Sequence, residues 1–438
     1  MNTPSLNRRR FLQSGTLGGL AAGAFLSDLA VAETVQAPAA DAELDDRIEG
    51  LLLGSLIGDA LGGPVEFQNL NDVARLTAPP KRWADDEVLD ATSMAAARDR
   101  LTLRPYAPLR PQPEPYAHWS VNAPPGTITD DSRHKMVLMD CLRTAHKKGR
   151  WPISARTLAQ TYLNWPAEGP LRQRPEAMKL NEDWLREWLF ASRWLLGERE
   201  ASQALPPERL WSGLPTCCGQ MTLPPLAGLY PGNPDSAYRA AYSLAYFDNG
   251  WGRDLNAALV AGLAEALTVP ANLPAPAAWE RIYKAMRGPD PYRYREVPWT
   301  HRSVDRWLDL AQSAAREANR HPARLFQRLE AEFSQTIKWE AQVPFVVMFA
   351  VLSLCEHEPL AALQLSIEWG HDTDSYAQMV GAFIGARHGV GLFPERLARP
   401  VRERLTADYG QDVREWVTLL RAIRGQGGRR RLIAEFGA

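Results

Sequence analysis

Apolar residues recur at helical spacing along most of the chain. From Leu44 onward, Ile48, Leu51, Leu52 and Leu56 follow the i, i+3, i+4, i+8 pattern of an amphipathic helix. Comparable segments predict further helices over residues 132–146, 181–197, 234–246, 255–267, 304–318, 323–333, 345–354, 359–369 and 376–386. No segment shows the sustained alternation expected of a β-strand. The pattern therefore predicts an all-α protein built as one compact domain.

Two of these segments carry glycines four residues apart, which places them on one ridge of each helix. They are Gly50, Gly54 and Gly58 in the first segment and Gly381, Gly385 and Gly389 in the last. Each glycine costs a helix about 1 kcal/mol relative to alanine, so three on one ridge indicate that a second backbone packs close by. We expect the two ridges to pack antiparallel, which would bring Asp59 and Glu66 to the same end as Asp372 and Asp374.

The first 32 residues have the order of an export signal. Consecutive arginines precede Phe11 and Leu12, an apolar stretch of small residues follows over 17–29, and Ala30-Val31-Ala32 offers a cleavage site. This order resembles a twin-arginine signal and predicts an exported, periplasmic protein; a disordered basic tail is the alternative. The apolar stretch is too short to cross a bilayer, and we expect no membrane span in the mature chain. Residues 33–43 are predicted to be a linker.

Composition and charge exclude several classes of protein. The chain has 438 residues and a formal net charge of -1, which argues against nucleic-acid binding through a general basic surface. Four cysteines in a chain of this length do not make a disulfide scaffold. The adjacent Cys217 and Cys218 are expected to be small buried residues, because neighbouring cysteines rarely bridge each other comfortably.

Three acidic motifs stand out against this background. The first lies within residues 58–66, the second is Thr129-Asp130-Asp131-Ser132, and the third is His371-Asp372-Thr373-Asp374-Ser375. The second and third each precede a predicted helix, so helix capping explains either one alone. Together they carry more carboxylates than caps require, and a divalent cation would offset the repulsion. The donors are all oxygens, which suit Mg²⁺, Mn²⁺ or Ca²⁺ rather than zinc.

These motifs, in this order, resemble those of the ADP-ribosylglycohydrolase family, which includes the hydrolase that reactivates dinitrogen reductase. A weaker match is the central segment Gly219-Gln220-Met221, followed by Pro225 and Gly228. The resemblance implies a compact, multi-helical orthogonal bundle with two Mg²⁺ ions, or Mn²⁺, in a cleft. The catalytic domain would span residues 44–438, with an irregular insertion around 67–126 that carries short helices.

The resemblance also implies roles for individual residues. The metal ligands would be Thr129, Asp130, Asp131, Asp372, Asp374 and Ser375. Catalytic roles would fall to Glu66, Asp372 and Asp374. Contacts with an ADP-ribosylated or nucleotide-like substrate would fall to Asp59, Gly219, Met221 and Tyr376. The implied chemistry is hydrolysis at the anomeric carbon of a ribose, with Glu66 as the acid or base.

Some positions depart from the family pattern. Ser132 and Ser375 stand where the pattern has threonine, which preserves a hydroxyl, whereas His371 replaces a glycine and Thr222 an arginine. These changes leave the acceptor side of the substrate open. A metal-dependent nucleosidase or phosphoesterase acting on free nucleotides is therefore one alternative, and a non-catalytic ADP-ribose-binding relative is another. Trp184 and Trp188 could stack on an adenine, but their spacing on one helix face favours core packing.

Overall fold

The computed structural model describes residues 38–67, 79–105, 124–169, 175–296, 301–427 and 431–436. The proposed signal and parts of the predicted linker and insertion lie outside these residues. Within them the protein is helical and has no strand, apart from isolated bridges joining Ile153 to Ile433 and Thr216 to Glu340. The all-α prediction is confirmed.

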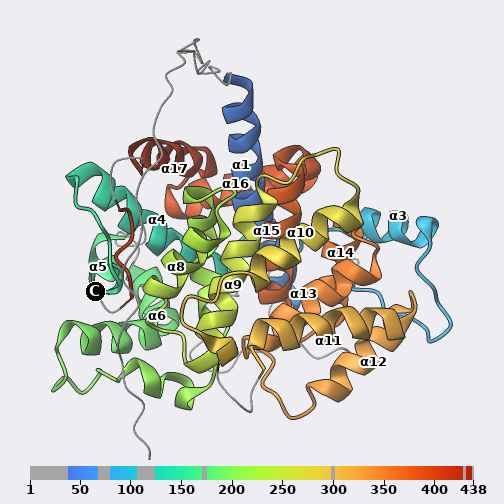
Figure 1. Cartoon of the computed structure of the whole chain (residues 1–438), viewed down its shortest axis with the longest axis horizontal. Coiled ribbons are helices and arrows are strands. Elements are labelled where there is room, and N and C mark those ends of the chain that lie inside the picture. The colour runs from blue at the N-terminus through green and yellow to red at the C-terminus, as the bar shows by residue number, and fades with distance from the viewer. Residues whose placement is uncertain are drawn as a thin grey trace, which may run out of the picture.

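Figure 1 shows the helices in order along the chain. They are α1 (Pro38–Gly62), α3 (Ala91–Arg100), α4 (Asp130–Lys148), α5 (Ala155–Glu168), α6 (Pro175–Leu196), α7 (Cys218–Thr222), α8 (Pro234–Leu244), α9 (Gly250–Ala266), α10 (Ala275–Arg287), α11 (Ser303–Ala318), α12 (Pro322–Glu332), α13 (Gln342–Leu354), α14 (Pro359–Glu368), α15 (Thr373–His388), α16 (Glu395–Tyr409) and α17 (Val413–Gly427). Short 3₁₀ turns add η1 (Gly63–Val65), η4 (Pro207–Gly213), η5 (Pro224–Leu229), η6 (Tyr294–Glu296) and η7 (Val390–Leu392).

Helix α1 begins at Pro38, so the last part of the predicted linker is helical. Proline suits the first turn of a helix, and the alanines and acidic residues that follow it extend the amphipathic segment backwards. In the predicted insertion, α3 is the expected kind of short helix. A capping box formed by Asp90 and Ser93 fixes its first turn.

The centre of the fold is the pair α1 and α15, which lie side by side in Figure 1 although they come from opposite ends of the chain. A Cβ atom built on Gly54 would lie 2.2 Å from the carbonyl oxygen of Gly381, and one built on Gly385 would lie 1.9 Å from that of Gly50. Residues later in α1 therefore contact residues earlier in α15, so the two helices run in opposite directions. The predicted antiparallel packing of the two glycine ridges is confirmed.

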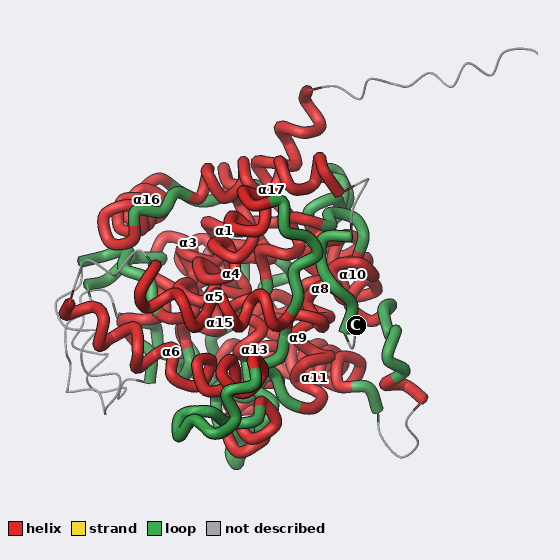
Figure 2. Tube along the Cα trace, turned by 90° about the vertical axis from the view of Figure 1, so that its left-hand side faces the viewer, coloured by secondary structure: helices red, strands yellow, loops and turns green. Residues whose placement is uncertain are grey.

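The other helices surround this pair. Helices α4, α7, α9, α13 and α14 pack on α15, while α16 and α17 contact α1 at the top of Figure 2. Helix α13 is buried on nearly all sides, as its uniformly apolar sequence predicts. One segment, Asp41–Val65, is long and apolar enough to cross a membrane, but 94% of its most apolar window is buried inside the protein. Packing against α15 accounts for its apolar character.

Candidate metal centre

The end of the α1–α15 crossing brings the first acidic motif to the third. The hydroxyl of Thr373 donates to the carbonyl of Gly62 at 2.8 Å, and the amide of Phe67 donates to the carbonyl of His371 at 2.7 Å. These two hydrogen bonds flank Glu66 in the chain. Glu66 therefore lies beside the third motif, as the ridge packing predicted.

The turn that leads into the third motif has an unusual backbone. Gly370 and His371 both adopt the left-handed region, with φ of 88° and 67°. A side chain is disfavoured there, which accounts for the glycine that the family pattern has at the position of His371. The imidazole Nε2 of His371 lies 2.9 Å from a carboxylate oxygen of Glu330, and this contact anchors the side chain.

The second motif begins α4 and is tied to α1. The hydroxyl of Thr129 accepts the amide of Asp131 at 3.1 Å and so caps the helix. The amide of Thr129 in turn donates to both carboxylate oxygens of Asp59, at 3.0 and 3.1 Å. Asp59 is fully buried, so its carboxylate holds the second motif in place. Its contact with a substrate stays a prediction.

The three motifs meet in one acidic cluster. Glu66, Asp372 and Asp374 form one group whose ligand atoms lie within 4.8 Å of one another, and Asp130, Asp131 and Asp374 form a second. Asp374 belongs to both groups. One buried oxygen of Asp372 and one of Asp374, the Oδ2 atom in each case, have no hydrogen-bond partner within the described part of the chain. Buried carboxylate oxygens of this kind are suited to a cation.

Two hydroxyls connect the second and third motifs. The hydroxyl of Ser375 donates to Oδ1 of Asp131 at 3.0 Å, across a separation of 244 residues in the sequence. The hydroxyl of Thr129 hydrogen-bonds to Asp374, whose pKa is raised mainly by burial, and this bond opposes part of that rise. Both predicted hydroxyl ligands therefore lie at the cluster, where each orients a carboxylate of the opposite motif.

The electrostatics of the cluster favour a bound cation. Burial raises the pKa of Asp131, Asp372 and Asp374 well above the ordinary value, and the charges of neighbouring carboxylates add to the increase. Burial also raises the pKa of Asp130 to about 6. Glu66 is partly exposed, yet burial of its carboxyl and the charge of Asp374 raise its pKa as well. The acidic residues present could hold a divalent cation, which would stabilise the ionised carboxylates.

Two buried polar residues behind the cluster were missed by sequence reasoning. Lys135 follows Asp131 by one turn of α4, and Gln378 follows Asp374 by one turn of α15. Burial lowers the pKa of Lys135 to about 8, although the nearby carboxylates oppose this shift. Their spacing of four residues from the acidic motifs was the available signal, because residues four apart share a helix face.

The predicted substrate-contacting residues other than Asp59 are also buried. The amide of Gly219 donates to Asp248 at 3.0 Å, and a Cβ atom at this position would lie 2.2 Å from the other oxygen of the same carboxylate. Tyr376 stacks on Trp369 with ring centroids 5.6 Å apart and donates to the carbonyl of Lys338. Met221 is 6% exposed. The substrate contacts of Gly219, Met221 and Tyr376 stay predictions.

Cysteine and tryptophan side chains near the site are core residues. The structure has Cys217 and Cys218 as free, buried thiols, as expected. The sulfur of Cys217 lies 3.8 Å from the hydroxyl of Ser375, which puts the central segment next to the third motif. Trp188 is buried and stacks on His134 with ring centroids 3.8 Å apart, which confirms core packing. The side chain of Trp184 lies outside the described residues.

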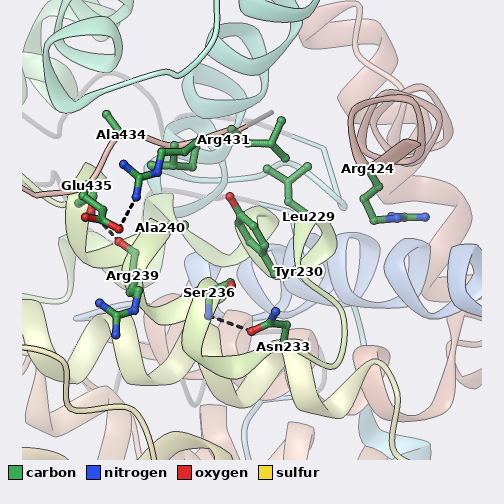
Figure 3. Close-up of a pocket in the computed structure, with 13 residues that line it drawn as sticks. Leu229, Tyr230, Asn233, Ser236, Arg239, Ala240, Arg424, Arg431, Ala434 and Glu435 are labelled. Carbon is green, nitrogen blue, oxygen red and sulfur yellow. Dashed lines mark hydrogen bonds and ion pairs between the residues drawn. The ribbon is translucent and has the colours of Figure 1, made fainter. Parts of the chain in front are cut away.

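A separate cavity of about 450 Å³ opens between α8 and the C-terminal segment, and no residue of the acidic motifs lines it (Figure 3). Three arginines contribute to its wall, but each is paired. Arg239 contacts Asp235 at 2.8 Å, Arg431 contacts Glu435 at 2.5 Å, and Arg424 contacts Asp45 at 3.2 Å. Because these charges are already matched, the cavity is not assigned as an anion site.

Comparison with known proteins identifies the family of the chain. The family model described as ADP-ribosylglycohydrolase matches residues 40–429. A solved structure described as "ADP-ribosylglycohydrolase-related protein complex" is 17% identical in sequence and aligns with a TM-score of 0.44, covering 87% of this chain and 99% of its own. No curated protein matches the sequence. Because the family model covers most of the chain, including all three acidic motifs, the chain belongs to the ADP-ribosylglycohydrolase family.

Proposed function

We propose that the protein is a Mg²⁺-dependent hydrolase that cleaves the glycosidic bond between ADP-ribose and a protein or small-molecule acceptor. Membership of the family implies glycosyl hydrolase activity. The observation that supports metal dependence is that two clusters of three acidic side chains share Asp374. These residues would hold the ions, and a two-metal site would supply Lewis acidity for displacement at a single centre.

The proposed ligands come from both halves of the site. Asp130, Asp131 and Asp374 would hold one ion, and Asp372 and Asp374 would hold the other, next to Glu66. The hydroxyls of Thr129 and Ser375 would complete the two shells. Mn²⁺ has similar ligand preferences and could replace Mg²⁺. When bound, the metal pair supplies Lewis acidity next to the anomeric carbon.

Glu66 is the proposed acid and base. Its side chain is partly exposed, whereas Asp372 is 4% and Asp374 1% exposed, so Glu66 is better placed to reach a substrate from the solvent side. Burial and the charge of Asp374 raise its pKa, which makes this carboxyl a stronger base than an ordinary glutamate. In the reaction, the bond from the anomeric carbon to the acceptor breaks and a bond to a water oxygen forms. Glu66 takes a proton from that water and gives a proton to the departing acceptor.

The decisive experiment supplies Mg²⁺ with ADP-ribosylated peptides linked through arginine or serine, and with free nucleosides and nucleotides alongside. Release of ADP-ribose from a peptide is the expected result, and it should disappear in Asp374→Asn. The matched control is Asp235→Asn, which changes an exposed aspartate. Release of free base or phosphate alone would indicate a nucleosidase or phosphoesterase. Tight metal binding without any turnover would indicate a non-catalytic ADP-ribose-binding protein.

We also propose that the chain is exported to the periplasm through its twin-arginine signal, which the sequence around Arg8 and Arg9 supports. Fractionation of cells that express the full chain should recover a shortened protein from the periplasm. The double substitution Arg8→Lys with Arg9→Lys should retain the unprocessed chain in the cytoplasm. Normal export of the double variant would contradict the proposed route.

A further inference from the structure

We propose that Lys135 is a built-in counter-ion and Gln378 a positioning residue for the acidic cluster. Together they would keep the cluster formed before metal binds. This inference rests on the metal-binding part of the proposed function, and it concerns residues on the core side of the site, away from any substrate.

The two side chains form a buried network with Asp131. Lys135 is 1% exposed, and its ammonium group donates to the backbone carbonyl of Asp131 at 2.7 Å and to the side-chain oxygen of Gln378. Gln378 is fully buried, and its amide nitrogen donates to Oδ1 of Asp131. The hydroxyl of Ser55 also donates to the oxygen of Gln378, at 3.3 Å. This pattern fixes the orientation of the amide, with its oxygen toward the Lys135 ammonium group and the Ser55 hydroxyl and its nitrogen toward the Asp131 carboxylate.

Gln378 therefore controls how the carboxylate of Asp131 is oriented. Two donors, the amide of Gln378 and the hydroxyl of Ser375, meet the same oxygen of Asp131, Oδ1. Two donors from α15 on one oxygen hold the plane of a carboxylate that belongs to α4. A side chain without a donor at position 378 would remove half of this restraint without changing the charge of the site.

Lys135 acts through its charge. Its ammonium group interacts favourably with the carboxylates of Asp131, Asp59, Asp374 and Asp130. The other buried cation on this helix, Arg133, donates to the carbonyl of Ile128 and to the hydroxyl of Tyr409, and its charge also acts on Asp130. In the metal-free protein, a buried positive charge offsets part of the repulsion among the carboxylates. Once divalent ions are present, the same charge repels them.

The two residues should therefore affect metal affinity in opposite directions. Removal of the charge in Lys135→Met should destabilise the metal-free protein and tighten Mn²⁺ binding by roughly tenfold, because repulsion between the cations is lost. Removal of the donor in Gln378→Met should weaken Mn²⁺ binding by roughly tenfold, because Asp131 is less well oriented. A purely structural role for Lys135 would lower stability without tightening metal binding.

The test measures Mn²⁺ affinity by calorimetry and the Tm with and without Mn²⁺, in the full chain. Lys148→Met is the matched control, since Lys148 is an exposed lysine on the same helix. If Lys135→Met does not fold, Lys135→Gln removes the charge but retains a donor, and it should change affinity in the same direction. Unchanged or weaker Mn²⁺ binding in the neutral variants would overturn the counter-ion role. Unchanged binding in Gln378→Met would overturn the positioning role.

These outcomes are separable from failure of the proposed function. If the unaltered protein binds no Mn²⁺ at all, the metal-dependent hydrolase proposal fails as well. If it binds Mn²⁺ and only the variants respond in the wrong direction, the hydrolase proposal stands and the inference alone fails.

Discussion

Individual carboxylates of the metal centre are held in different ways, and this difference governs what each substitution should do. Asp374 belongs to both groups of potential ligands and is almost completely buried. Glu66 belongs to one group and is partly exposed. Asp374 should therefore matter most for metal binding, and Glu66 should matter most for the chemical step.

Substitution of these two residues should separate binding from catalysis. Glu66→Gln is expected to lower kcat by about a hundredfold or more, the usual contribution of an acid or base, while most metal affinity remains. Asp374→Asn should lose Mn²⁺ binding and activity together. Calorimetry and single-turnover kinetics measure both quantities. Metal affinity in Asp374→Asn equal to that of the unaltered protein would contradict the shared-ligand assignment.

Metal binding should weaken as the pH falls. The pKa of Asp130 is raised to about 6, and burial raises those of Asp131 and Asp374 further above the ordinary value. Raised pKa values mean that protons compete with metal ions near neutral pH. Mn²⁺ affinity should therefore fall by roughly tenfold or more between pH 8 and pH 6, and binding should release protons. Calorimetry in buffers of different ionisation enthalpy measures that release; affinity independent of pH would contradict the raised values.

At the scale of helices, the packing of α1 against α15 could be predicted from the sequence. The helices that surround this pair were less predictable. The glycine ridges indicated both the partner and the direction of packing, because no other residue allows two backbones to approach so closely. The sequence analysis did not predict α5, α10, α16 or α17, and in α5 and α16 a proline, Pro166 or Pro400, interrupts the helix. Motifs such as Thr129–Ser132 predict a site through local chemistry. Lys135 and Gln378 could not be paired from the sequence, since their contact depends on how α4 packs against α15.

An alanine in the crossing should destabilise the fold. In Gly54→Ala, the new methyl group would lie 2.2 Å from the carbonyl oxygen of Gly381, and the helices would have to separate. The expected loss is about 2–3 kcal/mol in the free energy of unfolding, with weaker metal binding because the acidic motifs move apart. Gly425→Ala on α17 is the control. A Cβ atom there meets nothing within 4 Å, so stability should stay the same or rise by up to about 1 kcal/mol. Equal stability of the two variants would contradict the packing.

At the scale of the whole molecule, a buried ion pair and buried hydrogen bonds join helices that are separated in the sequence. Arg302, at the start of α11, contacts Asp254 of α9 through two nitrogens, and both side chains are fully buried. The hydroxyl of Tyr238 on α8 donates to the same carboxylate at 2.5 Å. Arg47 on α1 donates to the carbonyl of Val269 at 2.6 Å, after the end of α9. Specific polar contacts thus attach α8 and α11 to α9, and attach α1 to the segment that follows α9.

Removal of one partner from the buried ion pair should cost more stability than any surface change. In Arg302→Met, the carboxylate of Asp254 loses its cation, and the free energy of unfolding should fall by about 3–5 kcal/mol. The control, Arg239→Met, breaks an exposed pair with Asp235 and should cost about 1 kcal/mol or less. Denaturant unfolding measures both variants. A loss in Arg302→Met as small as that of the control would contradict a major role for the pair.

The pairing of α1 with α15 also has a consequence for biogenesis. Helix α1 can pack against α15, its main partner, only after residue 388 has been made, so its apolar surface stays uncovered during most of translation. A chain that stops before α15 would contain Asp130 and Asp131 but not Asp372 or Asp374. It would also expose the apolar surface of α1. We expect a chaperone to bind this apolar surface during synthesis. We expect metal binding only in chains that extend through α15, because both halves of the acidic cluster are then present.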